Sequence, residues 1–146
     1  VLLEKGVNLA LGTDSVASNN SLNFVEEIKL FSMIHKVREM DPTLITPKEA
    51  LRAATLAGAM SQGREDTGRL ALGMRADLIV LDLTGPHMHP CHDLLNNVIF
   101  SASGSDVILT MADGRVLYRD GEFLTLDLEK ILYETEASRR RILAEL

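Results

Sequence analysis

The chain has 146 residues, of which 46% are hydrophobic and 25% charged, and its formal net charge is −6. This length suits one domain with a sizeable core, and this composition excludes a disordered or fibrous chain. The acidic balance argues against binding along a phosphate backbone, so we expect no nucleic-acid partner. No apolar run approaches the roughly 18 residues of a membrane span, so we expect no membrane partner either.

The cysteine content bears on the cellular location of the protein, and the first residue bears on whether the sequence is a fragment. A single cysteine, Cys91, excludes a disulfide within the chain and fits a reducing compartment, so we expect a cytoplasmic protein. The opening residues lack the basic region and cleavage site of a secretory signal peptide. Because the chain begins with Val1 rather than Met, we expect the sequence to be a fragment of a longer protein.

A short apolar segment and a polar loop open the chain. Residues 7–11 lie between two glycines and are almost entirely apolar, which predicts a buried strand. Residues 12–21 are mostly polar and predict a loop. A buried parallel strand needs neighbours on both sides, and no segment before it supplies one. This strand therefore supports the fragment interpretation.

Two helices are predicted next. Apolar residues at helical spacing predict a helix that begins after Asn23 and stops at the Asp-Pro pair at 41–42. The Thr-Pro-Lys-Glu segment at 46–49 combines an N-cap, a proline in the first helical position and a capping box. We expect the helix that it starts to run through Ala57.

The second half of the chain has the pattern of a β protein. Strands are predicted over residues 77–83, 97–101, 107–111 and 116–118. The Asp-Gly pairs at 113–114 and 120–121 predict tight hairpin turns, because glycine tolerates the positive φ that these turns require. A final helix is expected over residues 127–146, where an apolar stripe returns at helical spacing.

Asp14 is the first candidate for chemistry because it directly follows the apolar segment. In a β/α barrel, residues at the C-terminal ends of the strands face the active site. The neighbouring Gly12 would allow the backbone to approach a ligand or metal closely. On spacing alone, the alternative that Asp14 only forms a turn or caps a helix stays open.

Several segments, in their order and spacing, resemble deaminases of the amidohydrolase superfamily. They are G-V-N-L-A-L-G-T-D-S at 6–15, A-S-N-N at 17–20, T-P-K-E-A-L at 46–51, G-M-R-A-D-L-I-V-L-D at 73–82 and the hairpin at 107–121. Within that superfamily the chain resembles the methylthioadenosine/S-adenosylhomocysteine deaminase and s-triazine chlorohydrolase branch. The resemblance covers nearly the whole chain, and the combination of segments makes it specific.

The resemblance implies a fold class of α/β and β. It places the last βα elements of a metal-dependent hydrolase TIM barrel in residues 1–62 and the C-terminal part of a small composite β-sandwich in residues 63–126. Residues 127–146 would be a C-terminal helix. The implied function is hydrolysis of a C–N bond that is not a peptide bond. The reaction would be deamination, or dechlorination, of a purine-like N-heterocycle by metal-activated water.

The resemblance also implies a metal site. In this family a divalent metal, zinc or iron, is held by an H-x-H motif, a further histidine and an aspartate after the last barrel strand. That aspartate corresponds to Asp14, which would serve as metal ligand and catalytic proton acceptor. Ser18, Asn19 and Asn20 would border the substrate, although the alternative that they only shape a turn stays open. Because the other ligands precede the matching segment, we expect the chain to be inactive by itself.

A histidine-rich segment supports a rival interpretation. Residues 87–92, called here the histidine loop, read H-M-H-P-C-H and contain several possible zinc ligands. The alternative function is a non-catalytic β module that binds a partner or zinc through this loop, which the resemblance instead makes a surface loop. Another alternative is a different branch of the superfamily, such as a guanine, cytosine or 8-oxoguanine deaminase or an imidazolone hydrolase. The expected partners are a small heterocyclic substrate and further copies of the chain in a homo-oligomer.

Overall fold

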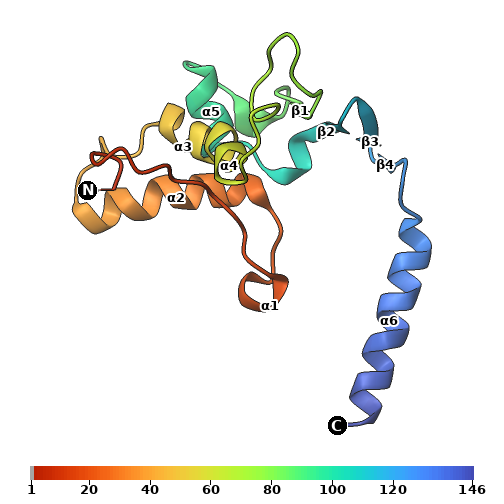
Figure 1. The fold of residues 1–146 in the computed structure, drawn as a ribbon. Helices are drawn as coiled ribbons and strands as arrows, with labels where there is room; N and C mark the ends of the chain where they lie inside the picture. The colour runs from red at the N-terminus through yellow and green to blue at the C-terminus, as the bar shows by residue number, and fades with distance from the viewer. Residues whose placement is uncertain (1) are drawn as a thin grey trace.

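The structure is a computed structural model that describes residues 2–146. Its helices are α1 (Val16–Asn19), α2 (Phe24–Glu39), α3 (Pro47–Ala54), α4 (Leu56–Ser61), α5 (Leu94–Phe100) and α6 (Leu128–Ala144). Its strands are β1 (Leu78–Leu81), β2 (Val107–Ala112), β3 (Arg115–Arg119) and β4 (Glu122–Phe123), and two 3-10 turns are η1 (Pro86–Met88) and η2 (Gly104–Asp106). Figure 1 shows α2 to α5 gathered beside the strands, with α6 extending away from both.

The predicted start of α3 is confirmed in atomic detail. The Thr46 side chain accepts a hydrogen bond from the Glu49 amide at 3.3 Å, and the Glu49 carboxylate accepts one from the Thr46 amide at 2.8 Å. The helix ends at Ala54 rather than Ala57, because Thr55 leaves the helical conformation with φ −128° and ψ −91°. The chain then turns into the separate helix α4.

The core lies between α2, α3 and α5. Ile45, Ala50 and Ile99 are buried there, and partly buried side chains pack around them. These surrounding residues are Ile28, Phe31, Leu44, Leu51, Leu95 and Phe100. Ser32, which is fully buried on α2, donates a hydrogen bond to the Ile45 carbonyl at 2.9 Å. This polar contact joins α2 to the segment that leads into α3 and makes α2 a firmly held element.

The strand predicted over residues 97–101 is wrong, since this segment lies largely within α5. The Asp93 carboxylate caps the helix by accepting a hydrogen bond from the Asn96 amide at 2.7 Å. Leu95 and Ile99, four residues apart, both face the core. A short apolar run does not distinguish a strand from a buried helix, and here the cap and the packing favour the helix.

Although α5 belongs to the predicted sandwich region, it packs on α2 and α3. The predicted region boundaries stay a prediction.

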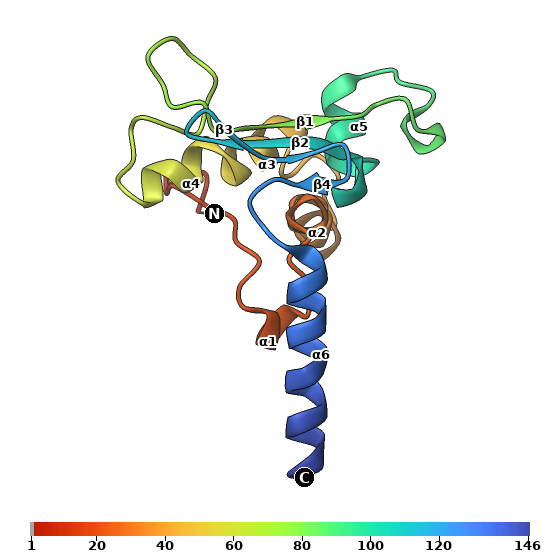
Figure 2. The ribbon, with the colours of Figure 1, turned by 90° about the vertical axis from the view of Figure 1, so that its right-hand side faces the viewer.

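The strands form an antiparallel sheet in the order β1-β2-β3-β4. Both predicted hairpin turns are confirmed, with φ of 51° and 77° at Asp113 and Gly114, and 47° and 94° at Asp120 and Gly121. The Asp77 carboxylate, just before β1, accepts a hydrogen bond from the Asp113 amide at 2.6 Å and so holds the first turn. In Figure 2 the strands cross the molecule and α6 runs away from them.

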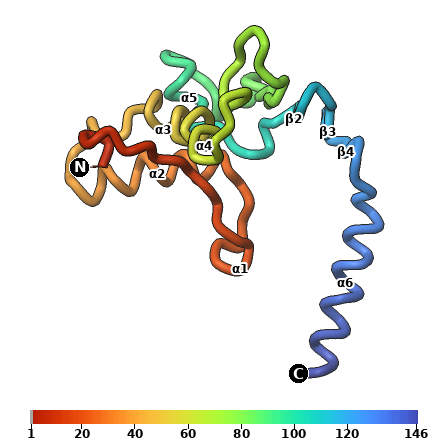
Figure 3. The backbone as a smooth tube through the Cα atoms, in the orientation of Figure 1, coloured from red at the N-terminus to blue at the C-terminus, as the bar shows by residue number. Residues whose placement is uncertain are grey.

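The predicted strand over residues 7–11 is an extended segment without a strand partner among the described residues. The Leu11 amide donates to the Ala53 carbonyl at 3.1 Å, and the Asn8 side chain donates to the Ala57 carbonyl at 2.9 Å. These contacts lay the segment along α3 and α4, and Figure 3 traces it from the N-terminus to α1. Extended backbone becomes a strand only where a neighbouring strand pairs with it.

The final helix is confirmed at α6, where the Asp127 carboxylate caps the first turn by accepting from the Lys130 amide at 2.9 Å. None of its residues is buried against the described part of the chain. Over residues 2–146, no helix combines the length and the apolar character needed to cross a membrane.

Candidate functional site

Asp14 lies in a loop between the extended segment and α1, in the left-handed region with φ 60°. This conformation costs a non-glycine residue about 1–2 kcal/mol, although Asp tolerates it better than most residues. The Asp14 side chain is exposed, and its Oδ1 atom accepts a hydrogen bond from the Ser15 amide at 2.7 Å. Its Oδ2 atom accepts none from residues 2–146. Asp14 thus presents one open carboxylate oxygen from a strained backbone position, a combination that is common at functional sites.

Ser18 and Asn20 lie close to Asp14 in sequence, at the end of the short helix α1. Both side chains are exposed. The Ser18 hydroxyl is 3.5 Å from that of Ser15, and Asn20 closes α1 in the left-handed conformation, where its amide donates to the Val16 carbonyl at 2.9 Å. Their role as substrate ligands stays a prediction.

Asn19 differs from these two neighbours because its side chain is partly buried and hydrogen-bonded. Its Nδ2 group donates to the Thr13 carbonyl at 3.0 Å and to the Glu27 Oε1 atom at 2.6 Å. Glu27 lies in the first turn of α2. The sequence does not single out Glu27, because acidic residues in the first turn of a helix are typical and explain Glu26 equally well. The predicted substrate role of Asn19 stays a prediction, beside this observed contact within the chain.

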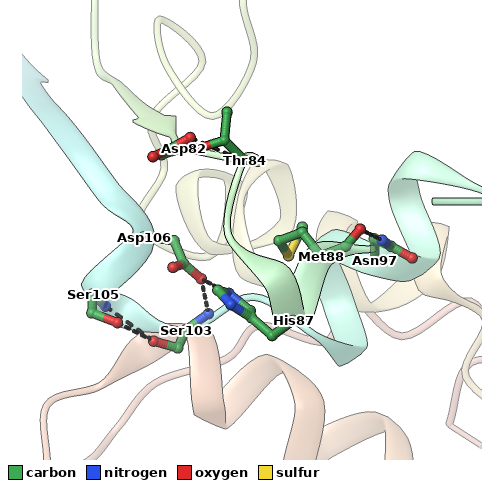
Figure 4. A network of polar contacts seen from close by, with 8 residues as sticks. All are labelled: Asp82, Thr84, His87, Met88, Asn97, Ser103, Ser105 and Asp106. Atoms are coloured by element: carbon green, nitrogen blue, oxygen red, sulfur yellow. Dashed lines mark hydrogen bonds and ion pairs between the residues drawn. The ribbon is translucent and has the colours of Figure 1, made fainter. Parts of the chain in front are cut away.

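The histidine loop is held by a polar network, shown in Figure 4. The Nε2 atom of His87 lies 2.9 Å from the Oδ2 atom of Asp106, which also accepts from the Ser103 amide at 2.8 Å. Because a carboxylate only accepts, the His87 ring N–H is the donor. The His87 contact, followed by the Ser103 amide, holds the Asp106 pKa below its ordinary value of 3.8. On the other side, the Asn97 side chain donates to the Met88 carbonyl at 2.6 Å.

Residues 89–92 of the histidine loop are exposed, including His89, Cys91 and His92, whereas the Met88 side chain is buried. In the part of the chain that the structure describes, no three or more His, Cys, Asp or Glu side chains are grouped so that they could hold a metal ion. A catalytic zinc ion usually has three protein ligands. The open carboxylate oxygen of Asp14 is a suitable donor for zinc or iron. Asp14 could therefore supply one of the protein ligands of such a site.

Comparisons with family models, curated proteins and solved structures all find similarity to amidohydrolases. The Amidohydrolase family model matches residues 1–117. The chain is 46% identical over 135 residues to a 5-methylthioadenosine/S-adenosylhomocysteine deaminase of Dictyoglomus thermophilum, an alignment that covers 92% of this chain and 32% of that protein. The fold of this chain matches a crystal structure of an adenosine deaminase from Xanthomonas campestris with bound zinc, with a TM-score of 0.94 and 32% sequence identity. The match covers 98% of this chain and 33% of the other.

A second solved structure is of an enzyme named for a different activity. The fold matches an atrazine chlorohydrolase from Arthrobacter aurescens TC1 complexed with zinc, with a TM-score of 0.83 and 30% identity over 92% of this chain and 30% of the other. The chain therefore spans about a third of the length of the curated relatives and solved structures that it matches.

Proposed function

Because this chain belongs to the amidohydrolase family, we propose that it is the C-terminal third of a metal-dependent aminohydrolase. Residues 1–62 would supply the last βα element of a barrel, residues 63–126 part of a β-sandwich, and residues 127–146 a terminal helix. The substrate would be a purine-like N-heterocycle with an exocyclic amino group. The names of the similar deaminases, which act on adenosine-type compounds, support this substrate class.

The observation that carries this proposal is the presentation of Asp14. Its Oδ1 atom is engaged by the Ser15 amide at 2.7 Å, while its Oδ2 atom is open and its backbone φ is 60°. Asp14 would ligate a zinc or iron ion together with histidines from the preceding part of the protein. The metal, when bound, lowers the pKa of a coordinated water and so supplies a nucleophile at neutral pH.

A residue of this chain would then accept and return the proton during the reaction. The Asp14 carboxylate would accept a proton from the attacking water while the new C–O bond forms at the ring carbon. The same carboxyl group returns that proton to the departing nitrogen as the C–N bond breaks, so that ammonia leaves and the oxygen stays on the ring. The exposed side chains of Ser18 and Asn20 would donate hydrogen bonds to the substrate from the end of α1.

The test is an Asp14→Asn variant of the full-length enzyme, assayed for ammonia release from adenosine-type substrates. We expect kcat to fall by about 10²–10⁴-fold, because the amide cannot accept and return the proton. Circular dichroism would establish that the variant is folded. A folded Asp14→Asn enzyme that retains its metal and wild-type kcat would overturn the proposal.

Dechlorination is a second candidate reaction, and it is favoured by the similarity to the atrazine chlorohydrolase. The proton acceptance by Asp14 would be the same, but chloride would leave in place of ammonia and without a proton, and Asp14 would then release the accepted proton to the solvent. Assaying the same enzyme with a chlorinated s-triazine and with an amino-substituted purine distinguishes the two reactions. The non-catalytic zinc module is less well supported, because His87 is already engaged by Asp106. The predicted homo-oligomer awaits a sedimentation measurement.

A further inference from the structure

We propose that Asn19 and Glu27 are positioning residues that hold the backbone at Asp14 in its left-handed conformation. This inference rests on the proposed function, because it assigns the two residues a role in catalysis through Asp14. Glu27 accepts a hydrogen bond from the Asn19 side chain at 2.6 Å, and the same side chain donates to the Thr13 carbonyl at 3.0 Å. A chain of contacts therefore runs from α2 to the peptide group between Thr13 and Asp14.

The orientation of the Asn19 amide follows from its partners. The Thr13 carbonyl and the Glu27 carboxylate are both acceptors, so only the NH2 group of Asn19 can face them. Its two hydrogens are then both donated, and only the Asn19 Oδ1 atom is left for other partners. Ser18 and Asn20, on either side, have exposed side chains with no such pair of contacts. Asn19 is thus set apart from its neighbours by what it binds.

The Thr13 carbonyl is an effective point at which to hold Asp14. The carbonyl shares a rigid plane with the Asp14 amide, so fixing the carbonyl fixes one side of the Asp14 φ rotation. On the other side, the Asp14 carboxylate accepts from the Ser15 amide at 2.7 Å. A backbone at φ 60° persists in a non-glycine residue only where its surroundings hold it. The Asn19 contact supplies that constraint and thereby aims the open Oδ2 atom.

Glu27 is a firm anchor for this contact because α2 is held in the core. The next residue, Ile28, and also Phe31 pack against the buried cluster, and Ser32 is fully buried. The Asn19–Glu27 bond is charge-assisted, and such bonds are short and roughly twice as strong as neutral ones. Glu27 and Asn19 are both partly buried, whereas Asp14 is exposed. The loop is therefore fixed from the protein side and open where a substrate would approach.

The test uses the full-length enzyme with Asn19→Ala, Glu27→Ala and Glu27→Gln variants. Glu26→Ala is the matched control, since Glu26 has the same charge in the same turn of α2 and an exposed side chain. For each variant kcat, KM and zinc affinity are measured, the last by competition with a chromophoric chelator. Partners that orient a metal ligand typically account for 10–100-fold in metal affinity or activity. We expect Asn19→Ala and Glu27→Ala to lower kcat and zinc affinity by about that factor, with KM within about twofold.

The conservative variant separates positioning from general stability. Gln at position 27 keeps an oxygen acceptor for Asn19, so Glu27→Gln should retain kcat and zinc affinity within about threefold, as Glu26→Ala should. The inference is wrong if Glu27→Ala matches Glu26→Ala in both quantities, or if Asn19→Ala raises KM alone, which would indicate a direct substrate contact. If Asn19→Ala does not fold, the comparison of Glu27→Ala with Glu27→Gln decides. If the Asp14→Asn enzyme is inactive but the Glu27→Ala enzyme has normal activity, this inference is wrong and the proposed function stands. If the Asp14→Asn enzyme is fully active, the proposed function itself is wrong.

Discussion

The Asp14 loop, residues 12–20, and the histidine loop, residues 87–92, differ in what their side chains bind. The histidine loop is richer in possible metal ligands, yet its His87 binds Asp106 at 2.9 Å and its other ligand-type side chains are exposed. The Asp14 loop has one carboxylate, but that carboxylate has an open oxygen and a backbone held from α2. Under the proposed function, the contacts that orient a single carboxylate would indicate a metal site better than a high density of ligand-type residues does.

The two loops also differ in what holds them. His87 ties η1 to η2, so its hydrogen bond stabilises a connection between parts of the fold. Asn19 ties the backbone beside Asp14, which itself is strained with φ 60°. The first arrangement is typical of a structural contact, and the second is typical of a residue kept in place for chemistry. The following experiments test this distinction.

The largest expected difference between the loops is in zinc binding by the full-length protein. Removing the proposed ligand in an Asp14→Ala variant should raise the zinc dissociation constant by more than about 100-fold. This effect would exceed the one typical of residues that only orient a ligand. A His89→Ala/His92→Ala double variant should bind zinc as the wild type does. Zinc titration with a chromophoric competitor measures both. Loss of one equivalent of zinc from the double variant, but not from Asp14→Ala, would instead favour the zinc module.

An intermediate effect is expected on local stability around the histidine loop. An Asp106→Ala variant leaves the Ser103 amide and the His87 ring without their acceptor, so the opening free energy there should fall by about 1–3 kcal/mol at neutral pH. Folding lowers the pKa of Asp106, so its ionised carboxylate stabilises the folded state fully above about pH 3.8, the ordinary pKa of the group. This stabilisation is lost as the pH falls through the lower pKa that Asp106 has in the folded state. Hydrogen exchange of the amides of residues 103–108, from neutral pH to about pH 3, measures the difference.

The matched control for this experiment is Asp93→Ala. The Asp93 carboxylate caps α5 and accepts hydrogen bonds from Asn96 rather than from His87 or Ser103, so its removal should leave the exchange of the Ser103 amide unchanged. A difference between the Asp106→Ala variant and the wild type that persists undiminished at about pH 3 would contradict the assigned role of the ionised carboxylate.

The smallest effect is expected at the exposed part of the histidine loop. Cys91→Ser and His92→Ala variants should change the free energy of unfolding by no more than about 0.5 kcal/mol, because exposed side chains without specific contacts contribute little. Thermal unfolding and ammonia release would both be measured. A marked loss of activity in either variant would show that the loop takes part in the reaction and would remove the contrast between the two loops.

Much of the local structure could be predicted from sequence because it depends on neighbouring residues. The cap at Thr46 and Glu49 joins residues three apart, and the Asp-Gly turns depend on backbone preferences of adjacent residues. The motifs also predict, through the resemblance that they carry, that Asp14 is a metal ligand, and this role stays a prediction. By contrast, residues 94–100 form α5 rather than a strand because packing on α2 and α3 decides the conformation of a short apolar run.

The sequence by itself determined the capped start of α3, the hairpins and the candidate carboxylate, since each depends on residues that are close along the chain. It determined the family through the order and spacing of such motifs over nearly the whole chain. Only the tertiary structure decided which side chains act together. Asn19 meets Glu27 from eight residues away, and His87 meets Asp106 from 19 residues away. The pairing of such residues depends on how the helices and loops pack, because no local preference distinguishes Glu27 from Glu26 or His87 from its neighbours.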